Sequence, residues 1–436
     1  MISPKRRKEI IDALRRGTVP QQSLDAFAVG LEPFEGALGE ELASVSSGAG
    51  VFKAVRGEYG SGKTFFARWI QERAKRDGFA TAEVQISETE TPLHRLETVY
   101  RRLIERLSTS DTHQGALRGI LDAWFYALEE DVLAEGGVDE SDEAALLART
   151  GELMEQRLAA INRHAPAFAT ALRAYRKATA EGENAIADGI LAWLSGEPSV
   201  GMAAKRYAGV KGDIDHFGAL SFLQGLLVIL KDSGFSGLLL VLDEVETLQR
   251  VRSDVREKSL NALRQLLDEV DSGRFPGLYV LITGTPAFFE GPQGIRRLAP
   301  LAQRLDVDFQ TDPRFDNPRA VQIRLTAFDQ ARLEEVGRKI RDLYAEDAKD
   351  PSRISTLADD AYIADLVAAV AGHLGGKVGI APRLFLRKLV GEVLDRIDLH
   401  SDFDPRRDYA LTITDHELSD AERHAAASAD DVELEL

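Results

Sequence analysis

An eight-residue segment has the residue types and spacing of a phosphate-binding loop. Gly57-Glu-Tyr-Gly-Ser-Gly-Lys-Thr64 fits G-x-x-x-x-G-K-[ST] at every fixed position. Glycines let the backbone turn tightly, so that its N–H groups and the N-terminus of the next helix can bind an anion. Lys63 would then reach the β- and γ-phosphates, and the Thr64 hydroxyl would coordinate Mg²⁺. The alternative is an accidental glycine-rich turn, but an apolar strand pattern precedes the loop and a helical pattern follows it.

This loop predicts ATP and Mg²⁺ as cofactors. The Asn-Lys-x-Asp pattern that specifies guanine is absent from the sequence, which favours ATP over GTP. The residues expected to bind the nucleotide are Gly57, Glu58, Tyr59, Gly60, Ser61, Gly62, Lys63, Thr64 and Phe65.

Two adjacent carboxylates follow the most apolar run of the chain, Leu238 to Leu242. Asp243 is placed to reach the metal together with Thr64, as a Walker B aspartate does. Glu244 could polarise the attacking water as a general base. A solvated acidic turn is the alternative, and the phosphate-binding loop elsewhere in the chain argues against it.

Thr283 ends the next apolar run, Leu278 to Ile282. Functional groups gather at the carboxyl ends of parallel strands, so its hydroxyl could orient the lytic water. The alternative is a turn that simply ends the strand, with Thr285 as the second candidate.

Two arginines could contribute to catalysis from outside the loop. Arg304 could reach the γ-phosphate of a neighbouring subunit, with Arg296 and Arg297 as competitors. Arg383, in Gly379-Ile-Ala-Pro-Arg383, could contact the γ-phosphate from within the same chain. Surface salt bridges are the alternative for both Arg304 and Arg383.

The elements that must position these residues alternate between strands and helices, which predicts a parallel sheet with helices on both faces. The fold class is therefore α/β: a P-loop NTPase with a five-stranded parallel sheet. The predicted strands are 51–55, 79–86, 238–242, 278–282 and, more weakly, 320–325. The interval from Thr64 to Asp243 exceeds the ~60 residues of two βαβ units by roughly 100. We assign that excess to a helical insertion over about 108–215, in which 198–215 looks irregular.

Four segments follow along the chain. We predict an N-terminal helical element over 1–50, an ATPase core over 51–325, a helical lid over 326–400, and a C-terminal extension with an acidic tail over 401–436. The next β-type run after residue 326 is 409–413.

Composition narrows the class of protein. The chain has 436 residues, no cysteine and a formal net charge of −17. Disulfides and thiolate metal sites are excluded, and so acidic a chain is not a general nucleic-acid coat protein. No apolar run approaches the ~20 residues that span a bilayer, and no secretory signal is evident. We expect a cytoplasmic protein that does not contact membranes.

Together these motifs resemble those of the AAA+ ATPases, near the branch of Orc1/Cdc6-type initiators and transposition-type ATPases. That resemblance implies that Thr283 is sensor 1, Arg304 the arginine finger and Arg383 sensor 2. Gly17-Thr-Val-Pro20 looks like the adenine-side element of the family, which adds Val19 and Pro20 to the nucleotide contacts. A shared site with a finger in trans implies a homo-oligomer.

More narrowly, the chain is similar to the ATP-binding protein D family of bacteriophage-exclusion (BREX) systems. This resemblance is carried by five segments: Ala13 to Pro20, Gly57 to Thr64, Leu242 to Glu246, Thr283 to Pro286 and Ala299 to Arg304. It implies antiphage defence, with other proteins of the system and DNA as partners.

Three kinds of function fit these observations. The chain could be an ATP-hydrolysing motor or switch that acts on DNA or on partner proteins. It could instead be a nucleotide-gated adaptor that recruits partners with little turnover. In a third reading, the helical insertion is the interaction surface.

Overall fold

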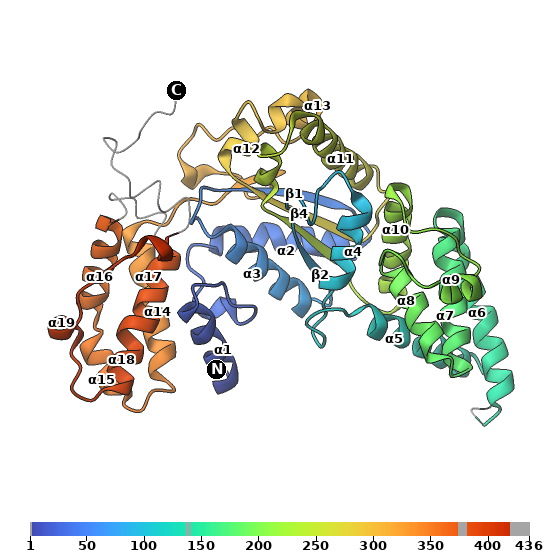
Figure 1. Cartoon of the computed structure of the whole chain (residues 1–436), viewed down its shortest axis with the longest axis horizontal. Helices are drawn as coiled ribbons and strands as arrows, with labels where there is room; N and C mark the ends of the chain where they lie inside the picture. Colours follow the sequence, from blue (N-terminus) through green and yellow to red (C-terminus); the bar gives the residue numbers. More distant parts are fainter. Residues whose placement is uncertain (1, 137–138, 140, 374–381, 419–436) are drawn as a thin grey trace.

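The computed structural model describes residues 2–136, 139, 141–373 and 382–418. Within these residues the core is a five-stranded sheet with the strand order β2-β3-β4-β1-β5, and every pair is parallel (Figure 1). The strands are β1 (Val51–Arg56), β2 (Ala80–Gln85), β3 (Leu238–Asp243), β4 (Leu278–Gly284) and β5 (Gln322–Arg324). The prediction of an α/β protein with five parallel strands is confirmed.

Strand register gathers the predicted chemistry at one edge of the sheet. Gln85 of β2 lies opposite Asp243 of β3, and Arg56 of β1 lies opposite Gly284 of β4. All strands run the same way, so the loops after β1, β3 and β4 leave from the same side. That side is where ligands bind in open α/β sheets.

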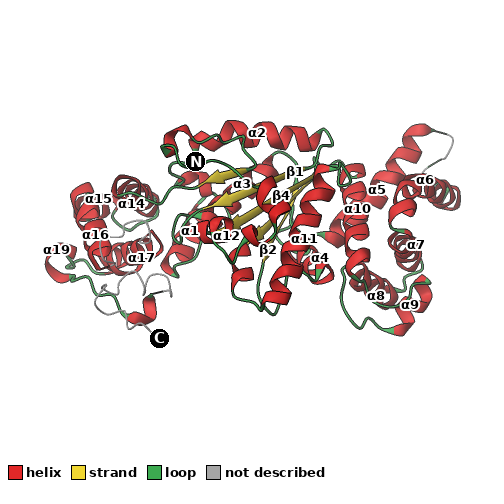
Figure 2. Cartoon of the chain, turned by 90° about the horizontal axis from the view of Figure 1, so that it is seen from above, coloured by secondary structure: helices red, strands yellow, loops and turns green. Residues whose placement is uncertain are grey.

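Helices cover both faces of the sheet, and each face has its own apolar cluster. On one face, Val241 and Leu281 pack with residues of α2 (Glu32–Ser46) and α3 (Lys63–Arg76). On the other, Leu240 and Val280 pack with residues of α4 (Leu96–Arg106), α10 (His216–Asp232) and α11 (Ser253–Asp271). Figure 2 shows α2 and α11 on opposite sides of the strands. Strands buried on both faces explain the continuous apolar runs of β3 and β4.

The predicted insertion is a bundle of helices at one end of the molecule (Figure 1). Its helices are α5 (Leu117–Glu135), α6 (Glu143–His164), α7 (Pro166–Ala180), α8 (Asn184–Leu194) and α9 (Met202–Ala208). It packs against α10, where Phe222 contacts the rings of Phe168 and Trp193. The expectation of an irregular segment over 198–215 was wrong in part, because α9 forms there. Its Ala204 and Ala208 are buried in the apolar cluster.

A helical module lies at the opposite end of the molecule (Figure 1). It contains α14 (Gln330–Ala345), α15 (Pro351–Leu357), α16 (Asp360–His373), α17 (Pro382–Lys388), a π-helical segment (Leu389–Leu394), α18 (Asp395–Leu399) and α19 (Pro405–Asp408). The N-terminal helix α1 (Pro4–Arg15) packs onto this module, and Arg15 donates to Asp395 at 2.6 Å. The N-terminal helix and the C-terminal module therefore meet.

The β-type run at 409–413 does not form a strand. Residues 409–413 are irregular rather than a strand, and Tyr409, Leu411 and Ile413 pack against the apolar cluster of the module. This packing partly buries their side chains although the segment does not pair with a strand. The predicted acidic tail lies mostly outside the described residues.

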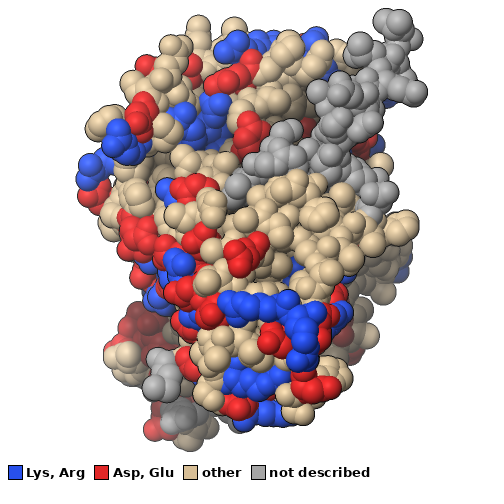
Figure 3. Space-filling view, turned by 90° about the vertical axis from the view of Figure 1, so that its left-hand side faces the viewer, with Lys and Arg blue, Asp and Glu red and all other residues tan. Residues whose placement is uncertain are grey.

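Short helices join β4 to β5: α12 (Pro286–Glu290) and α13 (Ala299–Arg304), with a 3₁₀ turn over Ile295–Arg297 between them. Further 3₁₀ turns occur at Leu24–Ala26, Val245–Gln249, Pro313–Phe315 and Asp415–Glu417. Across the described ranges, no helix is long and apolar enough to cross a membrane. Basic and acidic side chains are interspersed on the face shown in Figure 3.

Candidate nucleotide-binding site

The predicted phosphate-binding loop joins β1 to α3 and depends on its glycines. Gly60 and Gly62 have φ of 79° and 88°, the left-handed region that side chains other than glycine rarely adopt. A Cβ on Gly57 would come 2.3 Å from the Ser61 hydroxyl oxygen, so a side chain there would force the loop open. The hydroxyl of Ser61 is buried, and no group in the described chain bonds to it. The loop therefore has the shape of an anion cradle at the N-terminus of a helix.

Lys63 is the first residue of α3 and its ammonium is buried beneath the loop. Its Nζ donates to the carbonyl oxygens of Gly57 at 2.8 Å and Glu58 at 3.2 Å. The Tyr59 ring lies 5.3 Å from Nζ. Burial lowers the pKa of Lys63, while the charge of Glu246 raises it. The loop thus holds a positive charge at its centre.

Asp243 binds two hydroxyl groups from different elements. Its Oδ2 accepts a hydrogen bond from Thr64 Oγ1 at 3.1 Å, and its Oδ1 accepts one from Thr283 Oγ1. The backbone N–H of Glu244 reaches both Asp243 Oδ1 and Thr283 Oγ1, each at 3.1 Å. Burial raises the pKa of Asp243, and the bond from Thr283 opposes that shift. Residues from α3, β3 and β4 are joined at this carboxylate.

Glu244 has an unusual backbone conformation for its residue type. Its φ is 61°, in the left-handed region, which costs a residue with a Cβ of order 1 kcal/mol or more. The turn points its side chain back toward β2, where Gln85 Nε2 donates to Glu244 Oε2 at 2.8 Å. The carboxylate lines the same cavity as the loop and is only half-buried.

Glu246 is a residue of this site that the sequence analysis did not assign. It lies in the 3₁₀ turn after β3, is 6% exposed, and its Oε2 has no hydrogen-bond partner within the described residues. Burial raises the pKa of Glu246, and the charge of Lys63 lowers it. Its place in Asp243-Glu-Val-Glu246 was a signal that could have identified it. Glu246 therefore has a buried carboxylate oxygen without a hydrogen bond from the described part of the chain, and its charge interacts with that of Lys63.

An apolar chamber continues from the loop toward α1 and α14. The combined cavity has a volume of about 320 Å³ and lies where the loop, the N-terminal segment and the C-terminal module meet. Val19 and Pro20 line it, and so does Arg383 of α17. Its other apolar and aromatic lining residues are Leu14, Phe27, Val29, Leu31, Phe34, Leu325, Phe328, Val336, Pro382 and Leu386. An apolar chamber next to an anion cradle suits a ligand with a flat base at one end and phosphates at the other.

These residues fit ATP with Mg²⁺. The glycine cradle would hold the phosphates, and a hydroxyl 3.1 Å from a carboxylate is a donor set for one Mg²⁺. In the described part of the chain no cluster of three or more His, Cys, Asp or Glu side chains could hold a metal ion alone.

The arginines predicted to act at this site differ in position. Arg383 donates to the Glu417 carbonyl oxygen at 2.6 Å and lines the cavity. Arg304 ends α13, where it is exposed and pairs with Asp268 of α11. Neither it nor its competitors Arg296 and Arg297 line the cavity of their own chain.

Most predicted nucleotide contacts meet in this cavity. Those that line it are Val19, Pro20, Tyr59, Gly60, Ser61, Gly62, Lys63, Thr64, Phe65, Asp243, Glu244 and Arg383. Gly57 and Glu58 do not line the cavity, but their carbonyl oxygens accept hydrogen bonds from Lys63. Thr283 does not line it either, and is hydrogen-bonded to Asp243 and to the backbone N–H of Glu244, which do. Phe27, Phe328 and Val336 also line the cavity, and no sequence motif marks them. They come from loops and a helix that are distant in sequence from the phosphate-binding loop.

Comparison with known proteins agrees with this geometry. A family model described as BREX system ATP-binding protein BrxC/D matches residues 2–413. No curated protein matches the chain.

Proposed function

Because the chain belongs to the BREX system ATP-binding protein BrxC/D family, we propose that it binds ATP with Mg²⁺ between β1, β3 and α3 and hydrolyses it. In this proposal hydrolysis drives a motor or switch in a bacterial antiphage defence system. Other proteins of that system are its partners.

The observation that carries this proposal is the position of Asp243. It accepts hydrogen bonds from Thr64 of the loop helix and from Thr283 of the neighbouring strand. Thr64 and Asp243 would hold Mg²⁺ between them. The ion, when bound, would neutralise charge on the β- and γ-phosphates. A phosphate-binding loop without this carboxylate would bind an anion but would lack the second protein ligand.

Other residues have distinct roles in this proposal. Lys63 turns from the loop carbonyls to the β- and γ-phosphates. Glu244, oriented by Gln85, accepts a proton from the attacking water. Thr283 is a positioning residue, because it fixes Asp243 and the Glu244 backbone and does not line the cavity. Arg383 approaches the phosphates from the C-terminal module.

The AAA+ assignment is part of this proposal. Support comes from the five-stranded parallel sheet and from a C-terminal helical module that lines the nucleotide cavity as a lid would. The exposed position of Arg304, outside the cavity of its own chain, suits a finger that reaches the site of a neighbouring subunit. A homo-oligomer that acts on DNA would follow.

A nucleotide-gated adaptor is the second candidate. One observation favours it: Gln85 already donates to the Glu244 carboxylate, which restrains the proposed base. In that case ATP would lock the N-terminal segment and the C-terminal module around the cavity, and turnover would be slow.

Glu244→Gln separates these two functions. ATP binding would be measured by fluorescence anisotropy of a labelled ATP, and hydrolysis by phosphate release, with and without duplex DNA. For the motor or switch, the variant should bind ATP as wild type does and lose at least 100-fold in turnover. Lys63→Ala, the matched loop control, should lose binding. If wild type and Glu244→Gln bind ATP equally and turn over equally slowly, the enzyme proposal fails and the adaptor remains. If wild type does not bind ATP, both fail.

A further inference from the structure

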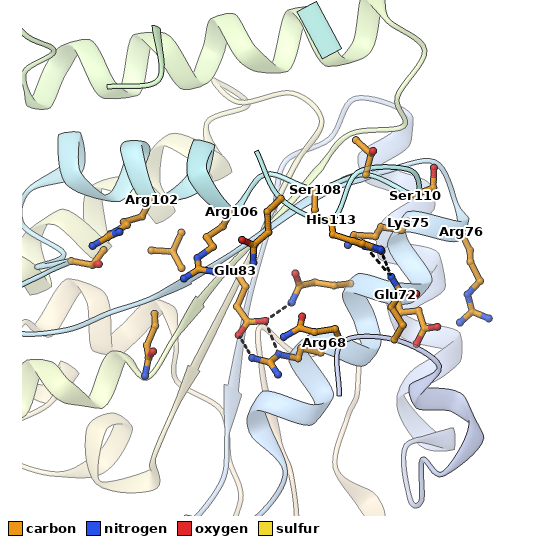
Figure 4. Close-up of a pocket in the computed structure, with 18 of the residues that line it drawn as sticks. Arg68, Glu72, Lys75, Arg76, Glu83, Arg102, Arg106, Ser108, Ser110 and His113 are labelled. Carbon is orange, nitrogen blue, oxygen red and sulfur yellow. Dashed lines mark hydrogen bonds and ion pairs between the residues drawn. The ribbon is translucent and has the colours of Figure 1, made fainter. Parts of the chain in front are cut away.

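A second cavity runs along the outer edge of β2, away from the nucleotide cavity. Its volume is about 680 Å³, and none of its lining residues lines the nucleotide cavity. One wall is a face of α3, with Arg68, Glu72 and Lys75 at helical spacing. The other wall is the end of α4 and the segment 108–114 (Figure 4).

The floor of this groove is an unpaired strand edge. On the β3 side, Ala80 donates its backbone N–H to Gly237 and Ile86 donates to Asp243. Thr81 instead exchanges both backbone hydrogen bonds with Ser108 on the opposite side. The alternation of a strand therefore turns the backbone N–H and C=O of Glu83 and Gln85 to the same outer side as Thr81. Over the part of the chain that the structure describes, no hydrogen bond reaches these backbone groups.

The register explains why the edge is open. The Thr81–Ser108 bridge is antiparallel, so the same pairing would place Arg106 opposite Glu83. Arg106 is the last residue of α4, and a helical residue cannot continue a ladder. The chain thus covers Thr81 and leaves the rest of the edge for another segment.

Around this edge, within the described chain, the acidic side chains already have partners, whereas several basic side chains do not. Each carboxylate is engaged: Glu72 accepts the N–H groups of Ser23 and Leu24, Glu83 pairs with Arg68, and Glu90 pairs with Arg102. Among the described residues, the side chains of the lining cations Arg6, Lys75 and Arg106 make no hydrogen bond or ion pair, and Lys75 is partly buried. The groove therefore offers unpaired positive charge in a chain whose net charge is −17.

We propose that this edge is a docking site for an extended, acidic segment of a partner protein. The segment adds to β2 as an antiparallel strand beside Glu83 and Gln85, in line with Ser108. Its backbone exchanges hydrogen bonds with the open edge, and its acidic side chains face Lys75 and Arg106. Strand addition of this kind draws affinity from the main chain and specificity from side chains.

A nucleic acid fits the groove less well. A phosphate backbone provides acceptors but no donors, so it leaves the carbonyl groups of Glu83 and Gln85 unpaired. None of the described residues that line the groove is Phe, Tyr or Trp, and its one imidazole, that of His113, is already hydrogen-bonded to Gln22, so the groove lacks a large aromatic side chain on which unpaired bases could stack.

The test uses a synthetic peptide and the full chain. The probe is fluorescein-labelled Glu-Glu-Val-Val-Glu-Glu with blocked ends, which as a strand presents glutamates on both faces, and binding is followed by anisotropy. We expect saturable binding that weakens at least tenfold in Lys75→Gln/Arg106→Gln. The control Arg252→Gln/Arg314→Gln, which removes equal charge from exposed positions elsewhere, should bind as wild type does. A peptide N-methylated at alternate residues should not bind.

A second readout separates strand addition from charge attraction. Amide hydrogen exchange should slow at Glu83 and Gln85 when the peptide is added and stay unchanged at Ala82 and Val84. Lys63→Ala should bind the peptide normally, so failure of the ATP proposal would not affect this test. The proposal is overturned if the peptide does not bind, or if N-methylation has no effect. It is also overturned if a 20-base-pair duplex displaces the peptide and depends on Lys75 and Arg106.

Discussion

Replacing Thr283 with valine keeps the shape of a fully buried side chain and removes its hydroxyl. That hydroxyl donates to the Asp243 carboxylate and accepts the backbone N–H of Glu244. A hydrogen bond to a charged group is worth about 1.5–3 kcal/mol, and one pKa unit corresponds to about 1.4 kcal/mol. The lost bond stabilises the ionised form, so we expect the pKa of Asp243 to rise further in the variant, beyond the increase that burial already causes.

The consequence should appear in the pH dependence of Mg²⁺ binding, because only the carboxylate form of Asp243 can hold the metal. The assay is the ratio of ATP affinities with and without Mg²⁺, measured between pH 5 and pH 9. In Thr283→Val the pH below which Mg²⁺ no longer strengthens ATP binding should lie higher than in wild type, and in that pH range the ratio should be smaller than that of wild type by about tenfold or more. Thr283→Ser, which keeps the hydroxyl, should retain the wild-type pH dependence. An unchanged pH dependence in Thr283→Val would refute the reasoning that this hydroxyl holds Asp243 ionised.

The same variant should change stability with a defined sign. The pKa of Asp243 is raised in the folded chain, so its contribution to stability is present at acid pH and is lost as pH rises through the folded-state pKa. Removing the hydrogen bond from Thr283 makes the ionised form of Asp243 less favourable in the folded chain, so more stability is lost as pH rises. The difference in unfolding free energy between wild type and Thr283→Val should therefore be larger at pH 8 than at pH 4.

Three further variants test other parts of the structure. Glu246→Gln removes a charge that raises the pKa of Lys63, so the loss of ATP affinity at alkaline pH should begin at lower pH than in wild type, as a binding titration would show. Arg304→Ala should keep ATP affinity and lose about 10³-fold in hydrolysis if the guanidinium acts in trans, and an unchanged rate would contradict that role. Gly225→Ala places a Cβ 2.6 Å from the ring of Phe168 and should destabilise the helical insertion by about 1–3 kcal/mol in thermal unfolding, while ATP affinity stays unchanged.

Local requirements made part of this protein predictable from sequence. A phosphate-binding loop needs glycine at positions where the backbone is left-handed or closely approached, so Gly57, Gly60 and Gly62 identified the loop. Strands buried on both faces need continuous apolar residues, so β3 and β4 were evident, as were the carboxylates that follow β3. In each case the physical requirement is met by residues that are adjacent in the sequence, so a local pattern reveals it.

Only the tertiary structure decided how these parts meet. Strand order and register place Gln85 opposite Asp243, and nothing near either residue specifies that pairing. The same is true of the chamber beside the loop, where α1, α14 and α17 converge after hundreds of residues of intervening chain. The run at 409–413 has strand-like residues, yet it forms no strand because packing on the module covers its apolar side chains. Glu246 became part of the site only when the turn after β3 buried it beside Lys63. Such contacts depend on packing between distant segments, for which the local pattern carries no information.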